Sequence, residues 1–127
     1  MPQFVVLRHD WPDLHWDLML ENGATLRTWR LSRPPDLVGP IEVRAIADHR
    51  LAYLTYEGPV SGNRGTVTRH LAGTYELRRD EPGRLEFVID AAAERWLAVL
   101  TEPVGMTGER REGSEVVWFE RDLPGDS

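Results

Sequence analysis

The chain has 127 residues, a length that fits one domain and allows about two-thirds of the unfolded chain's surface to be buried. It contains no cysteine, so disulfides, thiolate metal sites and thiol nucleophiles are excluded, and any metal must be held by histidine and carboxylate side chains. Its apolar runs are too short to span a bilayer, and no charged and then apolar leader opens the sequence. We therefore expect a single cytoplasmic domain over residues 1–127, with no membrane partner.

The formal net charge of −6 is unusual for a protein that binds nucleic acid. The charge is unevenly distributed, however: residues 1–79 contain ten arginines and nine acidic residues, whereas residues 80–127 contain five arginines and twelve acidic residues. All fifteen basic residues are arginines, which bind phosphate in a bidentate manner. The acidic composition therefore does not exclude a nucleic-acid partner for the first part of the chain.

The first part of the chain predicts a β-hairpin preceded by a short strand. A continuous apolar run predicts a strand over residues 3–8. From Leu14 to Glu21 apolar and other residues alternate strictly, which is typical of a half-buried strand. Asn22-Gly23 is a type I′ turn signal, and a return strand is expected over residues 24–31.

The rest of the chain is a series of short apolar segments separated by proline- and glycine-rich loops. Residues 90–100 fit either a helix that begins at Asp90 or a bend followed by a strand over 96–101. A charged loop is expected over 103–113. Many short strands with regular turn signals predict an antiparallel barrel or sandwich. Further strands are predicted at 41–47, 51–57, 66–71, 74–79, 84–89 and 115–121.

Two residues of the first hairpin and one residue that precedes it form a candidate metal site. In a strand, His15 and Asp17 point to the same side with Cα atoms about 6.6 Å apart, so both can reach one ion. His9 precedes a proline-containing loop that can return it to the same place. Two histidines and a carboxylate leave coordination positions open, which suits catalysis. The set fits phosphate chemistry on manganese, and it equally fits a non-haem iron oxygenase that uses the distant His70.

A second group of residues could act on a phosphate. His49 can donate a proton or stabilise charge, and Tyr53, four residues later, can orient a phosphate oxygen. Arg33 and Arg64 lie in proline- or glycine-rich loops from which a guanidinium could reach a phosphate. Trp11 beside the first histidine could stack on a nucleobase.

These motifs together resemble the 3′-phosphoesterase domain of bacterial DNA ligase D and its stand-alone relatives. The likeness covers residues 4–76. It is carried by these segments in order: Phe4-Val5-Val6, His9, Leu14-His15-Trp16-Asp17-Leu18, Leu20-Glu21, Trp29, Arg33-Pro34-Pro35, Asp48-His49-x-Leu51-x-Tyr53, Tyr56-Glu57-Gly58-Pro59-Val60-x-Gly62, Gly65-x-Val67 and Gly73-Thr74-Tyr75-Glu76.

The resemblance implies a mainly β fold: a small closed antiparallel barrel of about eight strands with at most one or two short helices. It implies Mn²⁺, or Zn²⁺ or another divalent metal, on His9, His15 and Asp17, with His49, Tyr53 and Arg33 contacting the phosphate. The implied activity removes a 3′-terminal ribonucleoside and then the 3′-phosphate from DNA ends before end joining. Nucleic-acid 3′ ends would be the partner, together with separate ligase or polymerase repair proteins.

Two positions depart from the family pattern. Met19 stands where the family has an arginine two residues after the metal-binding aspartate, and Ile41 stands at a second arginine position, with Arg44 nearby. Losing two phosphate-binding guanidiniums would weaken transition-state stabilisation. A module that binds DNA ends or a repair partner without cleaving them is therefore the alternative to an enzyme.

Overall fold

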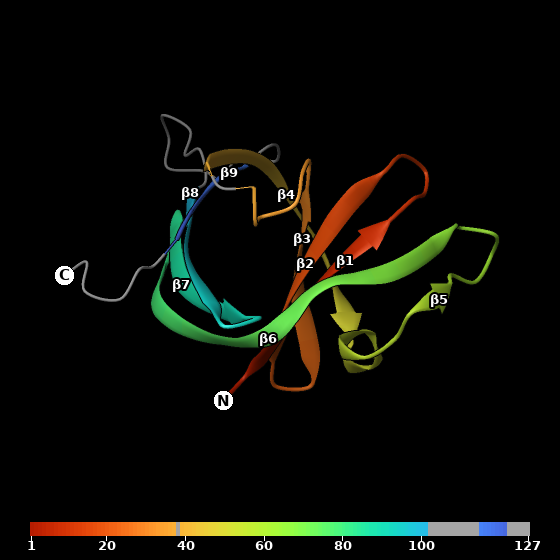
Figure 1. Ribbon diagram of the computed structural model, residues 1–127, viewed down its shortest axis with the longest axis horizontal. Coiled ribbons are helices and arrows are strands. Elements are labelled where there is room, and N and C mark those ends of the chain that lie inside the picture. The colour runs from red at the N-terminus through yellow and green to blue at the C-terminus, as the bar shows by residue number, and fades with distance from the viewer. Residues whose placement is uncertain (38, 102–114, 122–127) are drawn as a thin grey trace.

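The computed structural model describes residues 1–37, 39–101 and 115–121. In this part of the chain, no helix is long and apolar enough to cross a membrane. Within the described residues, nine strands form one antiparallel sheet in the order β1-β2-β3-β4-β9-β8-β7-β6-β5 (Figure 1). The strands are β1 (Gln3–His9), β2 (His15–Asn22), β3 (Thr25–Leu31), β4 (Gly39–Arg50), β5 (Gly58–Pro59), β6 (Thr66–Glu81), β7 (Arg84–Ala91), β8 (Glu94–Thr101) and β9 (Glu115–Arg121).

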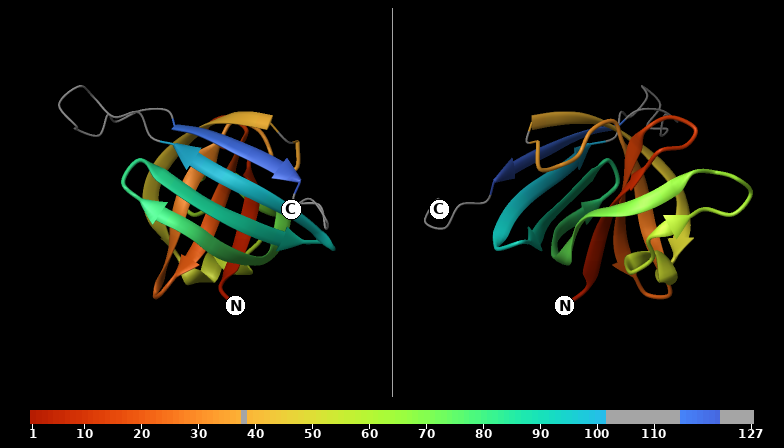
Figure 2. Two further views of the ribbon diagram at one scale, coloured as in Figure 1. Left: turned by 90° about the vertical axis from the view of Figure 1, so that its left-hand side faces the viewer. Right: turned by 45° about the vertical axis from the view of Figure 1, so that its right-hand side comes forward.

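The sheet curls so that β6–β9 pack across β1–β4 (Figure 2). β1 pairs with β2 along one edge and with β6 along the other, so the first strand of the order also contacts the last but one beside the main core. The result still differs from the simple closed barrel that we predicted. β4 pairs with β9 only through residues 39–43, and β6 turns to β7 only from Thr74 onward. An open half-barrel is therefore formed by β1–β3 together with residues 44–50 of β4 and 66–73 of β6.

The strands β1 and β2 are buried on both faces, which explains the continuous apolar run at the start of the chain. Phe4, Val6, Leu18 and Leu20 belong to the main core between the two halves of the sheet. Their neighbours on the other face form a separate cluster inside the open half-barrel, which we call the second cluster. It contains Val5, Leu7, Met19, Leu26 and Val67, with Tyr53, Leu54, Val60 and Ala72 packed against it.

The structure decides one open alternative and corrects two predicted elements. Residues 90–100 form no helix, because β7 continues to Ala91 and β8 begins at Glu94, so the strand alternative is right. The strand predicted at 51–57 is instead a single 3-10 turn, η1 (Leu51–Leu54), whose Tyr53 and Leu54 pack against the second cluster. The two strands predicted at 66–71 and 74–79 are one, because Gly73 is not a turn: a Cβ there would overlap the Asp90 carbonyl where β6 passes from β1 to β7.

The first hairpin turn lies one residue later than predicted. Asn22 pairs with Thr25, so the loop consists of Gly23 and Ala24. Gly23 has φ of 63°, and type II′ turns place a glycine at this first loop position. The shift fixes which residue of β3 lies opposite each residue of β2.

Candidate metal and phosphate site

The candidate metal ligands share one face of the β1–β2 ladder with the second cluster. His9 pairs with His15, Leu7 with Asp17 and Val5 with Met19, so these side chains form two adjacent rows. Period-two alternation sends the residues between them to the main core on the opposite face. Along residues 14–21, side chains therefore point alternately to the main core and to the candidate site.

The two histidines are oriented by main-chain carbonyls. His9 Nε2 donates a hydrogen bond to the Arg64 carbonyl at 2.8 Å, and His15 Nδ1 donates to the Asp13 carbonyl at 2.8 Å. Because a carbonyl oxygen only accepts, the proton of each neutral ring lies on the nitrogen that donates, which is Nε2 in His9 and Nδ1 in His15. The other nitrogens, His9 Nδ1 and His15 Nε2, carry lone pairs that face Asp17.

The three ligand atoms converge at a spacing that suits one ion. Asp17 Oδ2 lies 3.3 Å from His15 Nε2 and 3.7 Å from His9 Nδ1, and the three atoms lie within 4.8 Å of one another. Bonds of about 2.0–2.2 Å to a shared ion place ligand atoms roughly 3–3.6 Å apart. A cation placed among the two ring nitrogens and the carboxylate oxygen would contact all three. The donor set therefore fits a divalent metal with open positions.

The carboxylate of Asp17 is almost fully buried, with 3% of the residue exposed. Its second oxygen, Oδ1, accepts no hydrogen bond in the described part of the chain. The nearest cation is Arg30 on β3, directly opposite Asp17, with Nε 3.9 Å from Oδ1. Arg30 thus places positive charge at the edge of the metal site without taking up a ligand position.

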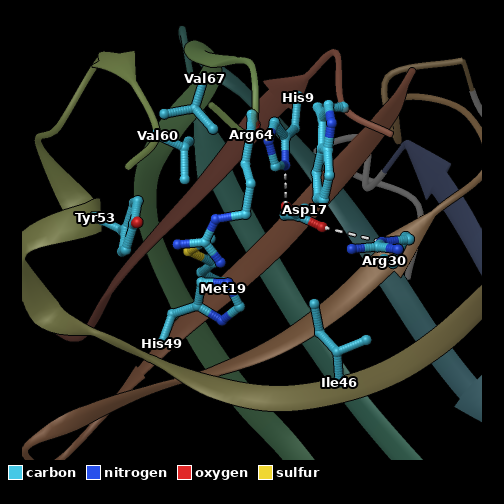
Figure 3. A pocket seen from close by; sticks show the side chains of 11 residues that line it. His9, Asp17, Met19, Arg30, Ile46, His49, Tyr53, Val60, Arg64 and Val67 are labelled. Carbon is cyan, nitrogen blue, oxygen red and sulfur yellow. Dashed lines mark hydrogen bonds and ion pairs between the residues drawn. The ribbon is translucent and has the colours of Figure 1, made fainter. Parts of the chain in front are cut away.

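A pocket of about 180 Å³ opens beside the ligands, between β1–β4 and the loop that follows η1 (Figure 3). His49 and Tyr53 line its opposite wall, with ring centroids 5.5 Å apart and the rings edge to face. His49 Nδ1 donates to the Ala47 carbonyl at 2.9 Å, which leaves Nε2 free for a ligand. The structure therefore brings His49 and Tyr53 to the same pocket as His9 and Asp17.

Arg64 contributes to this pocket twice. Its carbonyl orients His9, and its guanidinium is directed into the pocket, toward the side where Met19 and His49 lie (Figure 3). The side chain is held by Ser61, whose carbonyl accepts from Nε at 2.7 Å and whose hydroxyl lies 3.3 Å from Nη2. A guanidinium therefore reaches the pocket from the loop, above a buried Met19.

The other sequence candidates lie in different places. Arg33 does not line the pocket: its Nη2 donates to the Pro40 carbonyl at 2.7 Å. His70 pairs with Asp36 at 2.7 Å and is absent from the metal group found among the described residues, so the ligand set that needed it is not formed. Trp11 lines the pocket rim and is 42% exposed. Ile41 is buried in the main core, on the far side of the sheet.

Arg30 is the site residue that sequence reasoning missed. It lies four residues before the first proline of the Pro34-Pro35 pair and reads as an ordinary polar position of a strand. The hairpin register is the signal that identifies it, because pairing Asn22 with Thr25 sets Arg30 opposite Asp17. Counting from a turn at Asn22-Gly23 would have set Thr28 there instead.

Comparison with known proteins identifies the family of this chain. The model of the DNA ligase D 3′-phosphoesterase domain matches residues 7–116. The multifunctional non-homologous end joining protein LigD of Pseudomonas aeruginosa is 27% identical over 92% of this chain, and the chain spans 14% of that protein's length. The matched residues include every ligand and wall residue described above. The chain therefore belongs to the DNA ligase D 3′-phosphoesterase domain family.

Proposed function

We propose that this chain is a metal-dependent phosphoesterase that removes a 3′-terminal ribonucleoside or phosphate from DNA ends during end joining. The observation that carries the proposal is the convergence of two oriented histidine lone pairs and the Asp17 carboxylate beside a pocket lined by His49, Tyr53 and Arg64. Family membership supports the reaction class. Mn²⁺ is the expected ion, and the same three ligands also suit Zn²⁺.

His9, His15 and Asp17 would hold the ion, which when bound would polarise a phosphate oxygen and lower the pKa of an attacking water. The guanidiniums of Arg64 and Arg30 lie close enough to the pocket to neutralise the phosphate. His49 lines the pocket and, as the imidazolium with its second proton on Nε2, would donate that proton to the leaving oxygen, while the Tyr53 hydroxyl would orient the phosphate. In this assignment Arg64 and Arg30 replace the charges that Met19 and Ile41 lack.

The test is phosphate release from a 3′-phosphorylated primer–template by the purified protein with Mn²⁺. We expect release by the wild type and a loss of at least about a hundredfold for His9→Ala, because one of three ligands is removed. His70→Ala is the matched control, since His70 is bonded to Asp36 and lies outside the metal group, and it should retain activity.

A wild type that binds the primer–template but releases neither phosphate nor ribonucleoside would select the alternative, a module that recognises DNA ends without cleaving them. Met19 and Ile41, which leave two family arginine positions uncharged, are the observation behind that alternative. Equal release by wild type and His9→Ala would contradict the enzymatic proposal.

A further inference from the structure

Two arginines lie directly opposite one another at the edge of the site. Arg30 on β3 and Arg44 on β4 are cross-strand partners, in line with Asp17 on β2. Like charges at directly opposed positions destabilise a sheet unless something separates them. Arg44 is exposed and forms no ion pair within the described residues, and Arg30 has only its long contact with Asp17. The pair therefore has unused capacity to bind an anion.

The two arginines line a second pocket of about 200 Å³ that adjoins the metal site. His15 lines it from the ligand side, and Ser32 adds a hydroxyl. Arg30 lines both pockets, so the surface is continuous from Asp17 to Arg44. Because adjacent strands are about 4.8 Å apart, Arg44 begins two strand spacings from Asp17, a distance that one nucleotide of an extended strand can bridge.

One carboxylate opposes this arrangement. Glu42 lies on the same face of β4 as Arg44 and lines the same pocket, but no ion pair joins it to Arg30 or Arg44 in the described structure. Arg30, Arg44 and Glu42 together therefore give this pocket one net positive charge, and Glu42 should weaken anion binding there. Removing the charge of Glu42 should therefore strengthen anion binding, whereas removing the charge of an arginine should weaken it.

We propose that Arg44 binds the backbone phosphate adjacent to the reacting one, with Arg30 between the two phosphates because it lines both pockets. The inference rests on the proposed function for the identity of the reacting phosphate. A phosphate at a 3′ terminus has its only backbone neighbour on the 5′ side, so the ligand is the last internucleotide phosphate of the strand. Recognition of this group makes the protein bind a polynucleotide end more tightly than a mononucleotide.

The test compares two fluorescein-labelled oligonucleotides that both carry a 3′-phosphate. One has phosphodiesters throughout, and the other has a single uncharged methylphosphonate at the last internucleotide linkage. Anisotropy titrations with Mn²⁺ present, completed on ice before measurable phosphate release, measure binding by the metal-loaded protein. We expect Arg44→Gln to raise the Kd for the first oligonucleotide about tenfold, the loss of one charge-assisted contact, and to have little effect on the second.

Two variants control for charge. Arg78→Gln removes an exposed arginine from the part of β6 that pairs with β7, and it should change neither Kd. Glu42→Gln should lower the Kd for the phosphodiester oligonucleotide alone. If Arg44→Gln weakens both oligonucleotides equally, weakens neither, or the wild type does not distinguish them, the proposed contact is wrong.

Phosphate release from the same oligonucleotides separates this inference from the proposed function. A wild type that shows the Arg44-dependent difference in Kd and yet releases no phosphate would retain the binding site and overturn the enzymatic assignment. Release that is equally fast from both oligonucleotides, with equal Kd, would retain the enzyme and overturn the second phosphate site.

Discussion

The orientation of His9 depends on residues far away in the sequence. Its Nε2 donates to the carbonyl of Arg64, and the following Gly65 packs against the loop between β1 and β2. Asp10 strengthens this contact, because its Oδ1 accepts from the Thr66 amide at 2.8 Å. Groups that orient a metal-bound histidine commonly change metal affinity by about 10- to 100-fold when they are disturbed.

Gly65→Ala should therefore lower metal affinity. A Cβ at Gly65 would overlap Asp10 Oδ1 and lie 2.6 Å from the Trp11 Cβ, which displaces the loop and the carbonyl that holds His9. We expect the Kd for Mn²⁺, measured by calorimetry, to rise by about tenfold or more.

Gly62→Ala is the control for backbone strain. Gly62 and Gly65 both have φ of 75°, but a Cβ at Gly62 meets only Arg64 Nε, at 3.5 Å. Both variants should lose about 1 kcal/mol of stability from the left-handed backbone conformation, and only Gly65→Ala should lose metal affinity. Equal Mn²⁺ affinities in the two variants would contradict the role assigned to the Arg64 carbonyl.

The residues of the site were predictable to different degrees. The shared face of His15 and Asp17 follows from strand alternation, because side chains two residues apart in a strand point to the same face. The contribution of Arg30 depends on the register, which a one-residue error in the turn position changes. The position of Arg33 depends on a loop fold in which its guanidinium binds the Pro40 carbonyl, and no periodic pattern encodes that contact.

At the scale of elements, the turn between β7 and β8 carries backbone strain. Ala92 and Ala93 have φ of 51° and 64°, values that favour glycine or asparagine. The left-handed conformation costs an alanine about 1–2 kcal/mol. The pairing of β7 with β8, from Arg84–Thr101 to Ala91–Glu94, compensates for this strain.

The double substitution Ala92→Asn with Ala93→Gly should stabilise the protein. Asn-Gly is the preferred sequence of a two-residue type I′ turn, so we expect the free energy of unfolding to rise by about 1–2 kcal/mol. Urea denaturation measures the change. The matched substitution Ala24→Gly, in a loop whose strained position is already a glycine, should give no comparable gain, and a similar gain there would contradict the strain argument.

The same turn explains why the sequence left residues 90–100 undecided. Consecutive alanines favour a helix by propensity, but β7 and β8 bury Phe87, Ile89, Trp96 and Ala98 in the main core, and that burial outweighs the local preference. The turn η1 was missed for a related reason. Tyr53 and Leu54 pack against the second cluster, a contact that no alternation within residues 51–57 predicts.

At the scale of the molecule, metal binding and folding should be coupled. The ligands come from both strands of the β1–β2 ladder, and His9 is held by the loop before β6. We expect Mn²⁺ at about 100 times its Kd to raise the free energy of unfolding by roughly 2.7 kcal/mol, less any binding to the unfolded chain. Thermal unfolding with and without Mn²⁺ measures this change.

Asp17→Asn should abolish the Mn²⁺-dependent shift whatever its effect on the metal-free protein, because it removes the shared anionic ligand. His70→Ala should retain the shift. A stabilisation by Mn²⁺ that survives in Asp17→Asn would place the ion elsewhere.

The class of fold was predictable from the chain, but the two faces of its central strands were not. Regular turn signals and short strands correctly predict an antiparallel β structure. The alternation in residues 14–21 indicates one buried face, whereas Asp17 and Met19 on the other face are buried as well. That face is covered by η1 and by the loop that carries Val60. Both contact it through residues that are far from β1 and β2 in the sequence.

The pairing of β1 with both β2 and β6 has a consequence for the order of folding. The β1–β2 ladder joins His9 to His15 across a short loop, whereas the β1–β6 ladder joins Gln3 to Thr74 and His9 to Val67. Loop-closure entropy and folding time grow with sequence separation. We therefore expect the β1–β2 pairing to form first and the β1–β6 pairing to be a late, slower step. The three metal ligands would then assemble before the walls of the pocket, and an ion captured by the nascent hairpin could guide the rest of the chain onto it.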